Sequence, residues 1–259
     1  MNARLITSLT NPAVKAARAL HLRKERDETG LFLVEGLKSV TEAVRLGRAP
    51  KLLLHGEAAE SHPLLREAAA VAGETAVVSE AVLAKISRRD NPQAVLGVFE
   101  QAFTALDDLV PSDATCWVAL EAVRDPGNLG TIIRTADAAG CGAVILVGTC
   151  CDPFSVEAVR ATMGSIFAVP LVKTGVEDFL GWAARWPGAV VGTHLDATTD
   201  FREADYVKPA LLVMGNEQAG LTDAVAKACR MTVKIPMRGR ADSLNLAVAT
   251  GVMIYAATE

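Results

Sequence analysis

The stretch 235–256, IPMRGRADSLNLAVATGVMIYA, predicts a strand end, a loop and a long apolar helix in succession. Ile235 closes a β-rich run, and the proline after it cannot donate a further ladder hydrogen bond. Asp242 or Ser243 is a suitable N-cap, so we expect the helix to begin at Leu244. Apolar residues then recur at helical spacing with almost no charged face, which predicts a helix packed on more than one side: Leu244, Ala247, Val248, Gly251, Val252 and Tyr255.

The junction between this loop and this helix is a candidate binding site. A helix start presents several unpaired N–H groups and the positive end of the helix dipole. The loop before it carries Arg238 and Arg240, whose side chains can reach outward. Together these groups favour an anionic partner.

Length and composition are typical of a globular protein with two domains or one large α/β domain. The chain has 259 residues, of which 51% are hydrophobic and 22% charged. No apolar run approaches the length of a membrane span, and residues 1–20 lack the apolar core and cleavage site of a secretion signal. We therefore expect a cytoplasmic protein.

The cysteines and histidines predict neither disulfides nor a metal site. An odd number of cysteines without a C-x-x-C pair fits a reducing compartment: Cys116, Cys141, Cys150, Cys151 and Cys229. The four histidines are scattered along the chain rather than spaced as ligands. No metal is expected.

Positive charge gathers at the N-terminus, although the whole chain has a net charge of −4. Residues 1–26 hold one acid, Glu25, against six cations: Arg4, Lys15, Arg18, Arg23, Lys24 and Arg26. Such a basic arm on an acidic body predicts docking of a polyanion at one place, and a solvated helix face is the ordinary alternative.

The first hundred residues predict a small α/β unit. Asn11 as N-cap and Pro12 at the first helical position predict one helix over 11–26. Short apolar runs predict strands at 31–34, 51–55, 75–79 and 95–100, with helices at 37–46, 64–72 and 81–86. Residues 101–113 lose periodicity and hold three aspartates and a proline, which indicates a linker.

From residue 114 a second alternation of strands and helices begins. Strands are expected at 116–121, 143–147, 169–172, 189–194, 210–214 and 231–235. Continuous apolar runs such as 144–147 and 211–214 predict strands covered on both faces, hence a mostly parallel sheet.

Three loops that follow such strands carry the polar residues. The first contains Asn128 and, on the helix it opens, Arg134; the second is Gly215–Thr222, with Glu217 between glycines. The third precedes the C-terminal helix and holds Ser243 and Asn245. Each has an ordinary interpretation as a salt bridge, turn or helix cap, so the predicted site depends on the loops converging at the carboxyl edge of the sheet.

Taken in order, these motifs resemble the SpoU (TrmH-like) branch of the SPOUT RNA methyltransferases. The resemblance is carried by Asn128 with Arg134, by 215–217 (GNE) with Gly220, and by 235–237 (IPM) with 243–247 (SLNLA). It covers 116–257, and the segment 30–36, GLFLVEG, is similar to the family's ribosomal-protein-like substrate-binding module. One departure is Gln218-Ala219, where many relatives have a glycine.

The resemblance implies a domain plan, a donor, an acceptor and an assembly. Residues 1–100 would be an RNA substrate-binding domain, 101–113 a linker and 114–259 a SPOUT methyltransferase domain with a deep trefoil knot. The donor would be S-adenosylmethionine. The acceptor would be a ribose 2′-hydroxyl in ribosomal or transfer RNA, with 23S ribosomal RNA as the main expectation. The protein would be a homodimer. The cofactor-binding residues would be Thr193, Leu195, Gly215, Asn216, Ile235, Met237 and Leu244.

The resemblance also implies roles for the polar residues. Arg134 would clamp the target phosphate and stabilise the developing alkoxide; a role as general base is a further hypothesis, because a guanidinium normally stays protonated. Asn128 and Asn245 would orient the reacting groups, Glu217 would anchor the loop or Arg134, and Ser243 would fix the helix start. Phosphate contacts would come from Arg124, Arg238 and Arg240 near the target and from Arg23, Lys24 and Arg26 at a distance.

The sequence argues against two other classes of protein. A dinucleotide-dependent oxidoreductase requires a G-x-G-x-x-G turn, which 120–130 does not supply. A catalytically silent RNA-binding relative would be expected to have lost Arg134, Glu217 or Asn245, and all three are present. Binding of S-adenosylmethionine separates these alternatives.

Overall fold

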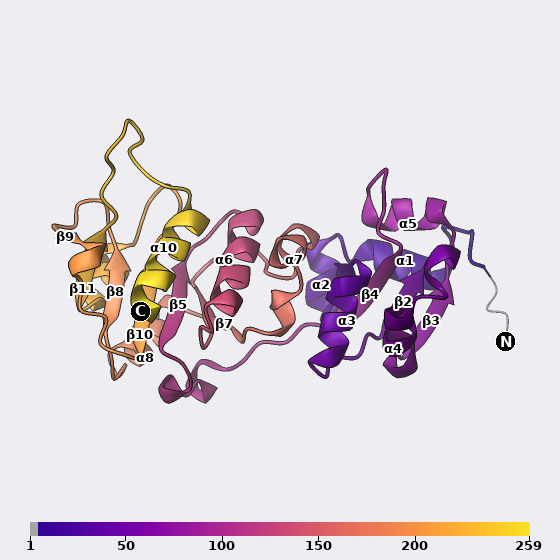
Figure 1. The fold of residues 1–259 in the computed structure, drawn as a ribbon, viewed down its shortest axis with the longest axis horizontal. Helices are drawn as coiled ribbons and strands as arrows, with labels where there is room; N and C mark the ends of the chain where they lie inside the picture. Colours follow the sequence, from indigo (N-terminus) through magenta and orange to yellow (C-terminus); the bar gives the residue numbers. More distant parts are fainter. Residues whose placement is uncertain (1–4) are drawn as a thin grey trace. The chain divides into compact units, whose positions relative to one another are not determined.

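The computed structural model describes residues 5–259, so Arg4 of the basic N-terminal stretch lies outside the described residues (Figure 1). The chain forms two compact units. The first contains the residues up to Gln101 together with Asp152–Phe167, and the second contains Ala102–Cys151 and Ala168–Glu259. The predicted division placed 152–167 in the second domain, and the structure places this segment in the first unit.

Aromatic packing and an ion pair hold 152–167 in the first unit. The rings of Phe154 and Phe167 lie 4.8 and 5.7 Å from that of Phe32. Arg160 Nη2 lies 2.6 Å from Glu35 Oε1. These partners are distant in the sequence, which is why a pattern of local periodicity could not assign the segment.

The first unit is built on a four-stranded sheet in the order β1-β4-β2-β3. Its strands are β1 (Leu31–Glu35), β2 (Leu52–His55), β3 (Glu74–Val77) and β4 (Val95–Glu100). β4 pairs antiparallel with β1 and β2, whereas β2 and β3 are parallel. All four predicted strands are confirmed.

Helices cover both faces of this sheet. α1 (Pro12–Ala19) and α5 (Glu80–Ser87) share one buried cluster with Leu33, Leu54 and Leu96. α3 (Leu37–Arg45) covers the other face, where a Cβ on Gly97 would lie 3.1 Å from Val40 Cγ2. α4 (Pro63–Val71) packs on α3, and α7 (Val156–Thr162) contacts β1.

The single helix predicted over 11–26 is two helices in the structure, α1 and α2 (Arg23–Thr29). Asn11 caps α1 as predicted, because its Oδ1 accepts from the Ala13 amide at 2.9 Å. The break occurs where His21 Nε2 lies 2.6 Å from the Ile86 carbonyl of α5 and Leu22 becomes extended. A tertiary contact therefore ends the helix, although its periodicity continues.

Arg26 is a structural residue, which corrects the prediction that it contacts RNA. Its side chain is buried, with 4% of the residue exposed. Its Nε donates to Asp152 Oδ2 at 2.7 Å, and its Nη1 donates to the Leu20 carbonyl at 2.7 Å. The charge is therefore paired inside the first unit and is not available to a polyanion.

Arg26→Ala is expected to lower the free energy of unfolding by about 3–5 kcal/mol, because it leaves the nearly buried Asp152 carboxylate without its partner. The matched control is Arg23→Ala on the same helix, which removes an exposed pair with Asp27 and should cost less than about 1 kcal/mol. Urea unfolding of both variants checks this. Equal, small losses would show that the buried pair contributes little.

The second unit is a seven-stranded parallel sheet in the order β7-β6-β5-β10-β8-β11-β9. Its strands are β5 (Cys116–Glu121), β6 (Val144–Val147), β7 (Leu171–Thr174), β8 (Val190–Thr193), β9 (Thr199–Asp200), β10 (Ala210–Met214) and β11 (Met231–Lys234). The six predicted strands and the mostly parallel α/β fold are confirmed; the two-residue β9 was not predicted. Short 3-10 helices occur in both units. Those of the first unit are Glu57–Ala59 and Ser165–Phe167, and those of the second are Leu106–Asp108, Pro111–Asp113 and Phe201–Glu203.

This sheet lies between two helical layers. α8 (Val176–Ala183) and α9 (Asp223–Ala228) share a buried cluster with Trp117 and Val213 on one face. On the other face, α10 (Leu246–Thr258) contacts β5, β10 and α6 (Pro126–Ala138), as Figure 1 shows. β6 and β7 follow β5 on one side of it in the sheet, whereas β10 and the other later strands lie on its opposite side. Parallel sheets usually bind ligands at such a switch point, beyond the carboxyl ends of the strands.

The C-terminal helix begins two residues later than predicted. Its N-cap is Asn245, whose Oδ1 accepts from the amides of Ala247 (2.9 Å) and Val248 (3.3 Å). Neither Asp242 nor Ser243 caps it, and Leu244 stays outside the helix. The trefoil knot that the resemblance implies stays a prediction.

Within residues 5–259, no helix has the length and apolar character needed to cross a membrane, and no group of three or more candidate metal ligands is present. All five cysteines are free thiols.

Candidate functional site

A pocket of about 390 Å³ lies beyond the carboxyl ends of β8, β10 and β11. All seven residues predicted to bind the cofactor line it: Thr193, Leu195, Gly215, Asn216, Ile235, Met237 and Leu244. Glu217 and Ser243 line it as well. Loops separated by more than forty residues in the sequence therefore meet at one cavity.

The loop after β10 is closed so tightly that its glycine is required. A Cβ on Gly215 would lie 2.1 Å from the backbone carbon of Gly220, well inside van der Waals contact. Asn216 and Gly220 exchange two backbone hydrogen bonds of 2.9 and 3.0 Å. Gly220 has a φ of +69°, which glycine adopts without strain.

The side chain of Asn216 shapes this loop. Its Oδ1 accepts from the amides of Gln218 and Ala219, each at 3.0 Å. Its Nδ2 donates to the carbonyl of Ala122 at 2.8 Å, and Ala122 has the unusual φ of +52°. Because both ends of its amide are engaged, Asn216 offers the pocket mainly its backbone.

Glu217 links the β10 loop to the loop after β5. Its carboxylate accepts from the amides of Arg124 and Asp125, each at 3.2 Å, and from Asn128 Nδ2 at 3.4 Å. Partial burial raises the pKa of Glu217, but the hydrogen bonds it accepts outweigh that effect and lower the pKa below its ordinary value. This geometry fits the loop-anchoring alternative among the roles predicted for Glu217.

Two asparagines extend the link to the third loop. Asn245 Nδ2 donates to Asn128 Oδ1 at 2.8 Å, while Asn245 also caps α10. The amide of Asn128 donates to Asp125 Oδ1 at 2.6 Å, because Asp125 is the N-cap of α6. A continuous hydrogen-bonded chain thus runs from the start of α10 through the start of α6 to Glu217.

Sequence patterns did not identify two acidic residues at this site, Glu121 and Asp196. Glu121, 3% exposed at the end of β5, accepts from the amide and hydroxyl of Thr222 at 2.8 and 2.7 Å. Asp196 also lines the pocket. A carboxylate at the end of an apolar strand was the one available signal for Glu121.

The remaining predicted residues lie outside this network. Arg134 is exposed on α6, is absent from the pocket lining and has no side-chain partner among residues 5–259. Arg124, Arg238 and Arg240 are also exposed. Ser243 donates to Asp242 at 3.2 Å rather than fixing the helix start.

The cations of α2 are largely neutralised by acids within the first unit. Arg23 and Lys24 lie 3.5 and 3.7 Å from Asp27 and Glu28, one turn further along α2. With Arg26 buried, α2 offers little unpaired positive charge.

The geometry agrees with the comparisons to known proteins. The profile of the SpoU rRNA Methylase family matches residues 115–255, and that of the MRM3-like substrate binding domain matches 11–97. The chain belongs to the SpoU rRNA methylase family. The resemblance predicted from the three motifs is therefore confirmed.

Other members of the SpoU family are similar to this chain over nearly their whole length. One is the Bacillus subtilis 23S rRNA (guanosine(2553)-2′-O)-methyltransferase RlmP, 32% identical over 96% of this chain and 97% of that one. An AdoMet-bound rRNA methyltransferase from Sinorhizobium meliloti is 50% identical, with a TM-score of 0.91 over 98% and 97% of the chains. AviRb from Streptomyces viridochromogenes, in complex with AdoMet, is 33% identical, with a TM-score of 0.84 over 96% and 97%.

Proposed function

We propose that this protein transfers the methyl group of S-adenosylmethionine to a ribose 2′-hydroxyl of 23S ribosomal RNA. The observation that carries the proposal is the hydrogen-bonded chain from Asn245 through Asn128 to Glu217 beside a pocket that all seven expected cofactor residues line. Relatives named as 23S rRNA 2′-O-methyltransferases match nearly the full chain, which supports this acceptor over transfer RNA.

The pocket fits the donor. Its volume of about 390 Å³ lies within the range of about 300–1,000 Å³ usual for small-ligand sites. Leu195, Met237 and Leu244 give it apolar walls, and Asp196 and Glu217 add carboxylates that complement a cationic ligand. When bound, S-adenosylmethionine supplies an electrophilic methyl group on a positively charged sulfur, so we also propose that the reaction needs no metal.

The chain's own residues would position and activate the acceptor. A ribose hydroxyl is a weak nucleophile, so it must be held in line and lose its proton as it attacks. The side-chain amides of Asn128 and Asn245, joined by a 2.8 Å hydrogen bond, would orient the ribose. Arg134, free of intramolecular partners in the described chain, would clamp the target phosphate. The exposed Arg124, Arg238 and Arg240 would supply further phosphate contacts.

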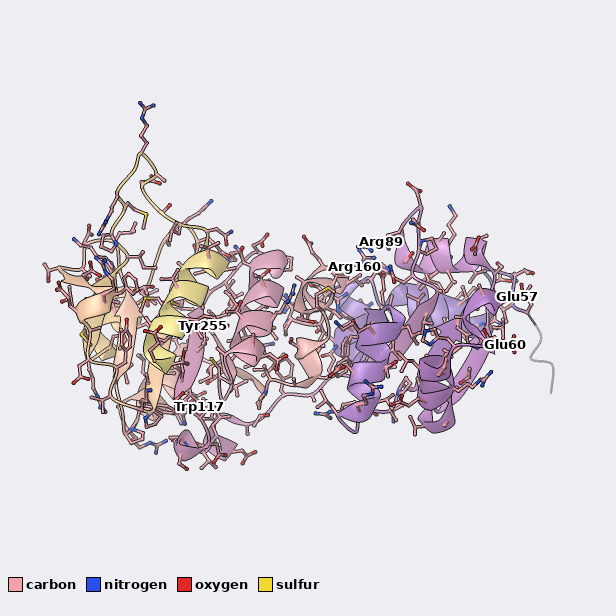
Figure 2. All side chains as sticks on the ribbon, in the orientation of Figure 1. Glu57, Glu60, Arg89, Trp117, Arg160 and Tyr255 are labelled. Carbon is pink, nitrogen blue, oxygen red and sulfur yellow. The ribbon has the colours of Figure 1, made fainter. Side chains whose placement is uncertain are left out.

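A second copy of the chain is proposed to cover the exposed side of α10. Val248 and Tyr255 of α10 lie about two turns apart and are each 54% exposed, and Leu244 just before the helix is 39% exposed (Tyr255 is labelled in Figure 2). The buried residues of the helix are Leu246, Ala247, Thr250, Met253, Ile254 and Ala257. Light scattering should give twice the chain mass at micromolar concentration, and Val248→Lys with Tyr255→Glu should give a monomer. A monomeric wild type would contradict the homodimer.

The activity is tested by incubating the protein with labelled S-adenosylmethionine and either 23S ribosomal RNA or transfer RNA, with and without EDTA. We expect label at one 2′-hydroxyl of 23S ribosomal RNA, unchanged by EDTA. Label in transfer RNA alone would favour the alternative substrate. Binding of S-adenosylmethionine without transfer to either RNA would favour a silent relative.

We also propose that the protein is cytoplasmic. Free thiols persist in a reducing compartment, and the proposed ribosomal RNA acceptor is found in the cytoplasm.

A further inference from the structure

Exposed cations gather on the layer formed by α1 and α5 in the first unit. Lys15 and Arg18 lie on α1, Lys85 lies on α5, and Arg88 and Arg89 follow α5 directly (Arg89 is labelled in Figure 2). α1 and α5 pack against each other, and the His21–Ile86 contact of 2.6 Å joins their C-terminal ends. The packing of α1 on α5 therefore brings the elements that carry these cations into one layer of the unit.

The side chains of these five cations have no hydrogen-bond or ion-pair partner in the part of the chain from residue 5 onward. The other cations nearby do. Arg23 and Lys24 pair with acids on α2, and Arg160 donates to Glu35 at 2.9 and 2.6 Å and to the Ser87 carbonyl at 2.7 Å. Lys38, Arg48 and Arg66 in the described part of this unit are also exposed without such a partner, but they lie on or just after α3 and on α4, whereas α1 and the end of α5 hold five such cations.

The pKa of His21, which lies between the two helices, is lowered by its surroundings. Burial is the largest cause that lowers its pKa, and the nearby charges of Arg88 and Arg160 lower it further, against the opposing effects of the Ile86 carbonyl and Glu35. Arg88 therefore lies close enough to His21 for its charge to act on the imidazole.

Arg88 occupies a backbone conformation that arginine does not favour. It is the C-cap of α5, with φ +55° and ψ +40°, and its amide donates to the Ala84 carbonyl. Glycine or asparagine usually fills this left-handed position, because a Cβ is disfavoured there. A charged side chain held in a strained position without an intramolecular partner suggests a contact made outside the chain.

We infer that Lys15, Arg18, Lys85, Arg88 and Arg89 form a surface that binds the phosphate backbone of the RNA acceptor, which rests on the proposed function. Phosphate is the anion that several separate Lys and Arg side chains recognise without base contacts. This surface replaces α2 as the RNA-binding part of the N-terminal arm. The ordinary alternative is that the cations at the end of α5 only stabilise the negative end of its dipole.

The test compares two triple variants with the same change in charge. Lys85→Gln/Arg88→Gln/Arg89→Gln removes part of the proposed surface, and the control Arg45→Gln/Arg48→Gln/Arg66→Gln removes exposed cations at and after α3 and on α4. Fluorescence anisotropy with 23S ribosomal RNA and with transfer RNA, across a salt series, gives Kd and its salt slope. We expect the first variant to weaken binding about 10- to 100-fold at low salt and to reduce the salt slope by about 2, with the control near wild type.

Equal Kd values and slopes for wild type and both variants with both RNAs would overturn the inference, as would a wild type that binds neither RNA. The proposed function has a separate readout, since it fails if bound RNA gains no methyl group. A further variant, Arg88→Gly, distinguishes RNA binding by Arg88 from stabilisation of the negative end of the α5 dipole. We expect its Tm to equal or exceed that of wild type while the Kd for RNA rises several-fold. A lower Tm with wild-type RNA affinity would assign Arg88 to the helix end alone.

Discussion

Arg134→Ala should lower the rate of methyl transfer to RNA by about 1,000-fold while the Kd for S-adenosylmethionine stays within about twofold. The reason is that Arg134 lies on the exposed side of α6, outside the residues that line the pocket. Its contribution is therefore to the acceptor and to the charge that develops on the ribose oxygen, where loss of one donor typically costs 100- to 1,000-fold. Single-turnover transfer and calorimetric binding of the donor measure the two quantities.

The control is Arg185→Ala, an exposed arginine of the same unit that forms a long pair with Asp107 and lines no part of the pocket. It should transfer methyl groups at the wild-type rate. If Arg134→Ala keeps more than about a tenth of the activity, the arginine is not part of the reacting site. If it loses donor binding as well, Arg134 acts through the pocket rather than on the RNA.

Arg134→Lys separates a clamp from a general base. A lysine keeps the positive charge but not the forked geometry, so a clamp predicts reduced activity with an unchanged pH optimum. A general base predicts that the pH optimum moves, because lysine and arginine lose their protons at different pH values. The pH profile of single-turnover transfer decides between the two.

Much of the fold followed from the sequence because most of the strands are short apolar runs that are buried on both faces. The run at 144–147 is β6, and the run at 211–214 is all of β10 except its first residue. The two-residue β9 could not be predicted, since Thr199 and Asp200 have no apolar pattern and are placed only by pairing with β11. Helix boundaries were less accurate where a distant contact decided them, as His21 does at the end of α1.

The same distinction applies to the site. That the three loops would meet was predictable, because the carboxyl ends of parallel strands share one edge and the motifs follow those strands. How they are joined was not, since the Asn245–Asn128 bond connects residues 117 positions apart. Arg26 shows the opposite error. The sequence predicted that its charge would bind RNA. In the structure its side chain is buried and pairs with Asp152, which is distant in the sequence.

Gly215→Ala should raise the Kd for S-adenosylmethionine by about 100-fold or more. The new Cβ would meet only backbone atoms, at 2.1 Å from the Gly220 carbon, 2.3 Å from the Leu221 nitrogen and 2.5 Å from the Gly220 oxygen. No side chain can rotate away to relieve this, so the Asn216–Gly220 bridge must open. Overpacking of this kind costs about 3 kcal/mol, which corresponds to roughly two decades in affinity if the loop must close for the donor to bind.

Gly239→Ala is the matched control, because Gly239 lies in the loop between β11 and α10, has no atom within 4 Å of a new Cβ and does not have a positive φ. It should bind the donor like wild type. Calorimetry gives both Kd values, and thermal unfolding shows whether Gly215→Ala is folded. A folded Gly215→Ala protein with wild-type donor affinity would mean that the β10 loop does not form the binding wall. The pocket beyond β8, β10 and β11 would then not be the donor site, because this loop supplies much of its lining.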